Sequence, residues 1–482
     1  MKPIYLTSGA YQSDAVIANL QRCVNLYPEI NPGDTKPGAP VTHWQRPGKK
    51  YLSSPGKAGV ARGLYRASNG DLYAVVADIV YFIDPQFRWF AIGVIQDGTS
   101  TASMADNGAF AGNELVLVDS TPNGYVINMQ TKAFAPIVDS SGLFKGSNVV
   151  CYLQTFFCFN VPNTQNWIIS NSDSVTFDAL DIAAKVSYAD NIQTIGVRQR
   201  EIWLIGSLTS EPWSLTGAPD FPFEAISSTF IPHGTAAVYS LVSSDVSLFW
   251  VQQALTGERM IVQSVGYEAQ RISTHAIEDI LAKMPTVADA IGQTFQIRGH
   301  TFVVWTFPTA DRTLVYDIST KQWCEFAWTD DDGNLHQDRV RYYAHAYGKI
   351  LGLDWETGDL VEIDPQTFTD FGKPISFIRG WPHVIDMMNR VTHWAFTADI
   401  QCGTIQDPNA EAPILSLRYS DDRGQTWSDW FQQSLGKTGE YMLSPQFRQL
   451  GMARDRVYEL MWSANAFTPL NGAYIDLEGS QS

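Results

Sequence analysis

The sequence has no long hydrophobic run and few cysteines. No apolar stretch approaches the about 20 residues that a membrane-spanning helix needs, so we expect no membrane segment. The start, from Met1 to Thr7, lacks the apolar core of a signal peptide, so we do not expect export by that route. Five scattered cysteines, an odd number, fit buried free thiols from a reducing cytosol better than a disulfide framework.

Positive charge is also scarce. Lys and Arg number 33 against 50 Asp and Glu, which gives a formal net charge of −17. A protein that grips the phosphate backbone needs clustered Lys and Arg, so the balance argues against that class. The negative charge is compatible with DNA that passes along the protein without binding, because an acidic surface repels the phosphate backbone.

Motifs for catalysis, phosphate binding and metal binding are missing. The eight histidines show no H-E-x-x-H spacing, and neither a Gly-rich phosphate loop nor a G-x-S-x-G elbow occurs. The stretch Asp330–Asn334 is faintly similar to a calcium loop but lacks the alternating ligands and the closing Glu, so we predict a solvated hairpin tip. We therefore expect no catalytic residues, no metal and no cofactor, and we predict that the protein is not an enzyme.

The abundant residues favour a large β protein. Hydrophobic residues make up 45% and charged residues 17% of the chain, which is enough for a sizeable core. Fifteen Trp and twenty Tyr favour strands, because flat rings pack well on a pleated surface. At 482 residues the chain is long enough for two or three domains.

Short strand-and-turn patterns recur along the chain. Tyr125–Phe134 and Leu314–Trp323 both read as an apolar strand, Asn or Asp, two spacers, Thr-Lys, one spacer and an aromatic residue. Ile83–Phe87 and Ile363–Phe368 form a second pair of echoes. The turn residues Asp84 and Asn128 are 44 residues apart, Asp317 and Asp364 are 47 apart, and the 189 residues between Asn128 and Asp317 make four steps of about 47.

Weaker markers at Asp173, Ser214 and Gln263 fill the gap and bring the number of units to seven. A period of about 40–50 residues with about four short strands is typical of a β-propeller. We therefore predict an all-β fold whose centre is a propeller of about seven blades. The alternative is a long β-sandwich array in which similar hairpins recur by chance. The segment from Ala276 to Met284 has helical spacing and predicts an insert between blades.

Two flanking regions differ from the repeats. Residues 1–60 are rich in Pro, Gly and Asn; Ala15–Gln21 predicts a turn or two of helix, and Arg22–Pro32 predicts an extended arm. The arm must lie on the chain's own next domain or on a neighbouring subunit. Beyond about residue 370 the repeat is lost, which predicts a small C-terminal β domain. The predicted division is 1–60 (arm), 61–370 (propeller) and 371–482 (C-terminal domain).

The most specific motif lies in this last region. Ser420–Trp427 matches the pattern S-x-D-x-G-x-T-W, the Asp-box, a turn found in bacterial sialidases and in many non-enzymatic β proteins. We expect the Asp422 carboxylate to bind backbone N–H groups, Gly424 to supply an unusual φ, and Thr426 and Trp427 to begin the return strand. With Ser420, these residues form a structural turn.

The Asp-box also raises the alternative of a glycan-binding or sialidase-like propeller enzyme. Such an enzyme needs several boxes on successive blades, a cluster of arginines and a Tyr activated by a carboxylate. A single box is present, outside the repeats. The arginines that could converge in principle are Arg66, Arg198, Arg200, Arg298 and Arg341.

Candidate contact residues lie in the arm and in the basic stretch from Arg448 to Arg456. We predict that this stretch is a salt-bridged strand edge or a subunit contact. The candidates for contacts with other subunits or partners are Arg22, Tyr27, Arg448, Arg454 and Arg456.

Several segments together resemble the packaged DNA stabilisation or tail hub proteins of short-tailed bacteriophages. They are Gln21–Glu29, Phe230–Ala236, Gly266–Thr274, Ser420–Trp427 and Gly436–Tyr441. The resemblance runs over essentially the whole chain, and the two C-terminal segments are its most telling part.

The resemblance implies a structural protein of the virion tail, made in the cytoplasm of the host bacterium. It implies a homohexameric ring below the portal and its adaptor protein, which extends the DNA channel and helps to retain the packaged genome. The implied partners are the adaptor, a tail needle or tip protein and receptor-binding tailspikes, while DNA passes through without sequence-specific binding.

Overall fold

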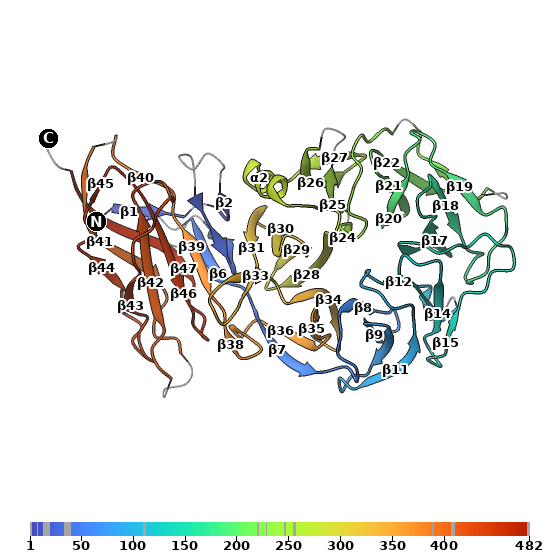
Figure 1. The fold of residues 1–482 in the computed structure, drawn as a ribbon, viewed down its shortest axis with the longest axis horizontal. Coiled ribbons are helices and arrows are strands. Elements are labelled where there is room, and N and C mark those ends of the chain that lie inside the picture. The colour runs from blue at the N-terminus through green and yellow to red at the C-terminus, as the bar shows by residue number, and fades with distance from the viewer. Residues whose placement is uncertain are drawn as a thin grey trace.

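The computed structural model describes residues 2–6, 8–12, 20–32, 40–108, 112–218, 221–227, 229–244, 247–253, 257–387, 389–405 and 410–479. The described chain forms two adjoining bodies, a β-propeller and a C-terminal β domain (Figure 1). The N-terminal helix predicted at Ala15–Gln21 lies outside the described residues except for its last two positions, which form part of strand β3 (Leu20–Gln21), paired with β2 (Tyr11–Gln12).

In the described part of the chain, seven four-stranded antiparallel units surround one axis, which confirms the predicted propeller of about seven blades. The first three blades are β8–β11 (Ala61–Arg66, Leu72–Val76, Ile79–Ile83, Trp89–Val94), β12–β15 (Ser103–Asp106, Glu114–Val118, Gly124–Asn128, Phe134–Pro136) and β16–β19 (Val150–Leu153, Phe156–Asn160, Asn166–Ile169, Ile182–Ala184). The next two are β20–β23 (Ile192–Arg198, Glu201–Gly206, Ser210–Leu215, Phe223–Ala225) and β24–β27 (Val242–Ser244, Ser247–Gln253, Arg259–Val265, Glu268–Arg271). Blade 6 is β28–β31 (Ile291–Ile297, His300–Phe307, Arg312–Asp317, Gln322–Glu325).

Blade 7 combines β34 (Val340–Ala346), β35 (Lys349–Asp354) and β36 (Leu360–Asp364) with β7 (Gly48–Ser53) from the N-terminal region. Strand β7 pairs antiparallel with β36 and closes the circle of blades. The helix predicted near residue 276 is α2 (His275–Lys283), capped by Thr274, and it connects blades 5 and 6. The hairpin β32–β33 (Ala327–Thr329, Leu335–Gln337) connects blades 6 and 7, and its tip contains the stretch predicted as a solvated hairpin tip.

The repeated turn has one physical origin. Asn128 accepts hydrogen bonds from the backbone N–H groups of Gln130 (3.0 Å) and Thr131 (2.8 Å), and Asp317 accepts one from Ser319 (2.9 Å). The lysines that follow, Lys132 and Lys321, both have a positive φ. A short polar side chain that binds the backbone two residues on is what such a turn requires. The turn therefore joins the third and fourth strands in both blades.

Apolar side chains fill the spaces between blades. Second strands such as β9 are buried on both faces, because each blade packs against its two neighbours. The largest of these buried side chains are Trp167, Trp203, Trp250 and Trp305. The abundance of Trp thus reflects the wide gaps between twisted blades.

The C-terminal domain contains two sheets that share a hydrophobic core. One sheet has β44 (Gln446–Arg448), β41 (Val391–Ile400), β47 (Leu470–Gly479), β6 (Val41–Gln45) and β5 (Leu26–Ile30), with β1 (Lys2–Tyr5) on β47 and β45 (Met452–Ala453) on β41. The other has β4 (Cys23–Val24), β39 (Phe377–Gly380), β46 (Asp455–Trp462), β42 (Ile414–Ser420) and β43 (Phe431–Ser434), with β40 (Val384–Ile385) on β46. Phe396 and Ile475 of the first sheet and Leu417 and Leu460 of the second lie in one core cluster.

The N-terminal region ties the two bodies together. Strand β4 pairs in parallel with β31 of blade 6 and antiparallel with β39. The arm therefore lies on the chain's own domains, and its strands belong to both of them. Strand β37 (Thr369–Asp370), which carries β38 (Lys373–Pro374), also pairs with β7.

A buried charge cluster lies at this junction. Arg46 donates to both carboxylate oxygens of Asp370 (3.1 and 2.6 Å), and the Lys49 ammonium lies 2.6 Å from Asp338 and 3.2 Å from Asp370. All four side chains are almost fully buried. Burial opposes ionisation of Asp370, yet the neighbouring Arg46 and Lys49 hold its pKa below the ordinary value. Two cations and two anions thus compensate each other where the arm, blade 7 and the following segment meet.

Candidate functional sites: the Asp-box hairpin, the arginines and the propeller channel

The Asp-box forms the turn that follows β42, at the edge of the second sheet of the C-terminal domain. Asp422 accepts hydrogen bonds from the Thr426 N–H (2.8 Å), the Thr426 hydroxyl (2.6 Å) and the Ser420 hydroxyl (2.7 Å). The Ser420 hydroxyl in turn accepts from the Gly424 N–H (2.7 Å). These bonds, those of Thr426 first, lower the Asp422 pKa to about 2. All these groups serve the turn itself.

Gly424 has a φ of +88°, which glycine adopts without strain. A Cβ at this position would lie 2.7 Å from Cδ1 of Leu20 in the N-terminal arm. The glycine therefore serves the turn and also leaves room for the arm.

Two ion pairs clamp the Asp-box turn onto strand β46, and the sequence did not reveal them. Arg456 donates to both oxygens of Asp421 (2.5 and 2.7 Å), while Arg423 donates to Asp455 (2.9 Å). Arg456 is itself buried, lies 3.9 Å from the centre of the Tyr419 ring and donates to the Leu450 carbonyl (2.6 Å). The variable positions of the motif thus hold the turn in place. In the sequence, the only indication of these ion pairs is the alternation of acidic and basic residues at Asp421, Arg423, Asp455 and Arg456.

Trp427 lies beside Arg418 of strand β42. The Arg418 guanidinium is 4.5 Å from the centre of the Trp427 ring and 4.6 Å from that of Trp430, so it lies between two aromatic faces. The return strand β43 begins at Phe431, which corrects the prediction that Thr426 and Trp427 begin it. Residues 427–430 instead hold the two indole rings against the arginine.

The predicted contact residues fall into two groups. Arg22 pairs with the buried Glu459 at 3.4 Å, Tyr27 is buried against His300 and Phe302, and Arg456 belongs to the clamp just described. These three side chains thus serve contacts within the chain. Arg448 and Arg454 are exposed, and their predicted role as contacts with other copies or partners stays a prediction.

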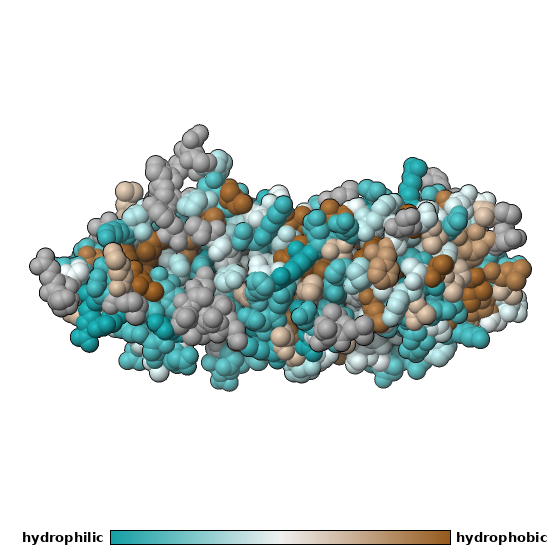
Figure 2. Space-filling view, turned by 90° about the horizontal axis from the view of Figure 1, so that it is seen from above, coloured by the Kyte–Doolittle hydropathy of each residue, from teal (hydrophilic) through white to brown (hydrophobic). Residues whose placement is uncertain are grey.

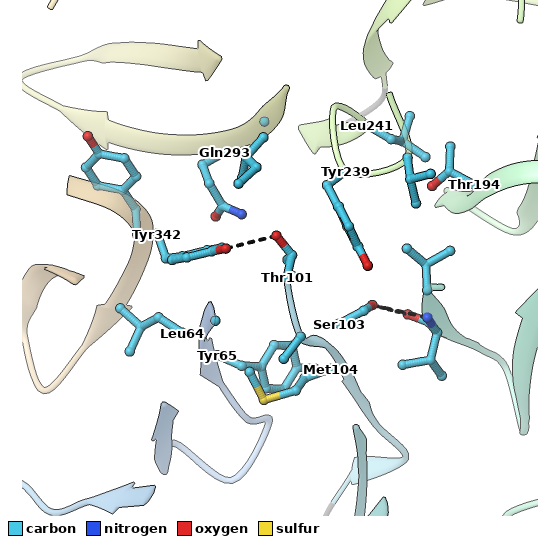
Figure 3. A pocket seen from close by; sticks show the side chains of 18 of the residues that line it. Leu64, Tyr65, Thr101, Ser103, Met104, Thr194, Tyr239, Leu241, Gln293 and Tyr342 are labelled. Atoms are coloured by element: carbon cyan, nitrogen blue, oxygen red, sulfur yellow. Dashed lines mark hydrogen bonds between the residues drawn. The ribbon is translucent and has the colours of Figure 1, made fainter. Parts of the chain in front are cut away.

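At the centre of the propeller lies a cavity of about 380 Å³, lined by strand residues of six blades and by the segment that leads into β24 of blade 5 (Figure 3). Two side chains of the wall, Tyr342 and Tyr239, form hydroxyl hydrogen bonds. The hydroxyls of Thr101, just before β12, and Tyr342 in blade 7 are 2.9 Å apart, and those of Ser120 and Tyr239 are 2.5 Å apart. Burial raises the pKa of Tyr239 to about 12, so this hydroxyl stays protonated. Gly63 allows blades 1 and 2 to approach closely in the cavity wall, since a Cβ there would lie 2.8 Å from the Ala102 carbonyl oxygen.

The arginines that a sialidase would need do not converge. Arg66 lines the central cavity, Arg298 lines a separate cavity between the propeller and the C-terminal domain, and Arg341 is buried against Trp355. Arg198 and Arg200 lie at the hairpin between β20 and β21. Tyr65 donates to Asp106 (2.8 Å) in the cavity wall, but burial and that carboxylate raise the tyrosine pKa. Of these five arginines only Arg66 lines the same cavity as Tyr65, so they do not form the cluster that a sialidase uses to bind the substrate carboxylate.

Within the described ranges, no group of three or more His, Cys, Asp or Glu side chains is placed to hold a metal ion. Among the same residues, no helix combines the length and apolarity needed to cross a membrane.

Known proteins provide an independent comparison. No curated protein matches the chain significantly. Among solved structures, the WD40 β-propeller domain of Doa1 is 8% identical with a TM-score of 0.40, over 66% of this chain and 96% of that one. The β-propeller domain of Cps50 (Swd1) from Myceliophteria thermophila is 10% identical with a TM-score of 0.42, over 65% and 99%.

The computationally designed Ika8 protein is 12% identical with a TM-score of 0.38, over 71% of this chain and 99% of that one. The family model described as bacteriophage P22 Gp10, β-propeller, matches residues 5–367, which include all seven blades and all but the first four residues of the predicted arm. The resemblance to phage stabilisation proteins is thereby confirmed, and the chain belongs to the phage stabilisation family of bacteriophage P22 Gp10.

Proposed function

We propose that this phage structural protein forms a ring-shaped tail hub below the portal and its adaptor. The observation that carries the proposal is the family match over residues 5–367. In this role the ring extends the DNA channel, helps to retain the packaged genome and provides attachment surfaces for a tail needle or tip protein and for tailspikes. The proposed ring is a homohexamer in the virion.

The shape of the propeller bears on where DNA would pass. Its central cavity holds only about 380 Å³, and the lining residues Thr101 and Tyr342 are hydrogen-bonded to each other at 2.9 Å. A DNA major groove alone is about 12 Å wide. The channel of the hub would therefore lie on the axis between several copies, with each propeller standing beside it.

The charge of the chain suits such a channel. A net charge of −17 per copy repels the phosphate backbone, so DNA would meet a wall that it does not bind. Retention of the genome would then come from closing the channel with a partner at the tip.

Rigidity supports the same role. The arm supplies strands to both sheets of the C-terminal domain and to blade 7, and Arg46, Lys49, Asp338 and Asp370 form a buried charge cluster between these bodies. A hub under load needs domains that keep their relative positions. In this protein the strands of the N-terminal arm pair with strands of the C-terminal domain and of blade 7.

Light scattering of the purified protein, alone and with the portal-bound adaptor, tests the proposal. We expect monomer or weak association alone and a ring on the adaptor. Persistent monomer in both samples would contradict the hub assignment.

A further inference from the structure

The outer edge of blade 3 exposes an unusually dense set of apolar side chains. Leu180 is 79% exposed, Val186 is 71% exposed, and Ile182 and Tyr188 are also exposed within the same nine residues. Strand β19 is the outermost strand of the blade, so its free edge lies in this patch. Figure 2 shows hydrophobic side chains gathered at this end of the molecule. We call the segment from Leu180 to Tyr188 the blade 3 edge.

Buried polar groups hold the blade 3 edge in shape. The Lys185 ammonium is fully buried, forms an ion pair with Asp190 and donates to the Thr209 carbonyl (2.8 Å). Glu211 accepts hydrogen bonds from the backbone N–H groups of Val186 (3.1 Å) and Ser187 (2.9 Å). The loop is therefore fixed by its polar side chains while its apolar side chains point outward. Preorganised apolar surface of this kind is typical of a binding site.

The C-terminal domain has a second apolar projection, in the loop between β43 and β44. Tyr441 is 67% and Met442 95% exposed, and Leu443 is exposed as well. The loop is closed by hydrogen bonds from Gly439 N–H to the Gly403 carbonyl (3.1 Å) and from Lys437 N–H to the Glu440 carboxylate (2.8 Å). We call Tyr441–Leu443 the apolar tip.

The two surfaces lie at opposite ends of the molecule, because blade 3 and strands β43 and β44 are at opposite ends of its long axis (Figure 1). One copy cannot bring them together. The blade 3 edge is acidic, since Asp178 and Asp181 flank Leu180, while the loop that carries the apolar tip has one exposed cation, Lys437, and one exposed carboxylate, Glu440. Burial and the nearby Asp178 raise the pKa of Asp181, so a cation placed beside these carboxylates would relieve their repulsion.

We propose that the apolar tip of one copy docks on the blade 3 edge of a second copy, with Lys437 beside Asp178 and Asp181. The contact joins two different surfaces, so it is heterologous and can close into a ring. This inference rests on the proposed hub function and identifies the surfaces through which neighbouring copies of the hub touch.

Site-specific crosslinking tests the contact in the sample in which light scattering detects the ring. Val186→Cys protein is mixed with Met442→Cys protein under mild oxidation. Val94→Cys protein, altered at an exposed valine on the outer strand of blade 1, replaces the first partner in the control. Four native thiols are buried and Cys151 is half-buried, so the new cysteines are the most accessible. We expect about tenfold or more covalent dimer over the control, because docking raises the local thiol concentration.

Dimer at the control level in a sample that contains rings would overturn the docking proposal and leave the hub function intact. A sample with no ring even on the adaptor would overturn both. A charge reversal provides a second measurement that does not depend on cysteines. Lys437→Glu should weaken ring formation, and Asp178→Lys in the same chain should restore it. No restoration, with both variants folded, would also overturn the contact.

Discussion

Replacing Asp370 by Asn removes one negative charge from the buried cluster at the junction of the propeller and the C-terminal domain. Arg46 loses its bidentate carboxylate, and Lys49 keeps only Asp338. The four side chains are at most 3% exposed, so water cannot solvate the cations that lose their partner. Breaking a buried pair by removing one partner costs about 3–5 kcal/mol. That is a large share of the about 5–15 kcal/mol by which a domain is stable.

Urea unfolding followed by Trp fluorescence measures the change. The matched control is Asp331→Asn, the same chemical change in the exposed pair with Lys373, where the two side chains are 86% and 49% exposed. An exposed pair contributes up to about 1 kcal/mol, so the control midpoint should move little. Equal midpoint shifts in the two variants would refute the reasoning that burial makes the junction cluster essential.

Three further predictions concern single groups. Asp422→Ala should lower the urea midpoint, because the Thr426 and Ser420 donors lose their acceptor; an unchanged midpoint would argue against a structural Asp-box. The Asp422 pKa of about 2 lies below its ordinary 3.8, so its contribution should be full above pH 3.8 and fade as pH falls towards 2, which an acid titration of native and variant stability detects. Burial lowers the pKa of His300, but Asp317 and Glu29 outweigh it and raise the pKa above 6.5. Its contribution should therefore be full below pH 6.5 and be lost as pH rises through the raised value, and a His300→Gln variant with the same pH profile would contradict this.

The propeller was predictable because each blade carries a local signal. Asp84, Asn128, Asp317 and Asp364 all lie where the third strand of a blade ends, and each binds backbone N–H groups of the turn that follows. The weaker markers Ser214 and Gln263 lie on third strands, and Asp173 follows one. A turn that requires a particular side chain can be recognised from the sequence, because the same residue type recurs at the same position.

Pairing between strands that lie far apart in the sequence could not be predicted in this way. Strand β7, inside the predicted arm of residues 1–60, completes the last blade by pairing with β36 more than 300 residues away. Pairing between Arg46 and Asp370 spans a similar distance. Local composition predicts an extended segment at Arg22–Pro32, where the structure has strands β4 and β5, but the strands with which they pair depend on the folded surfaces that meet.

The candidate sites likewise contain local features that the sequence predicts and long-range contacts that it does not. The bonds of Ser420, Asp422, Gly424 and Thr426 follow from the spacing of the motif. The basic stretch predicts Arg456 as a contact residue, and the structure pairs it with Asp421 of the same chain. Exposure, which distinguishes Arg448 from Arg456, depends on which face of the final strands the core covers.

Imaging phage particles that carry this protein tests the central claim most directly. With the protein labelled at an exposed position, the account predicts a closed ring of copies on the tail axis, directly below the portal and adaptor, with the DNA channel between the copies. A label on the capsid surface, or single copies away from the tail axis, would contradict it.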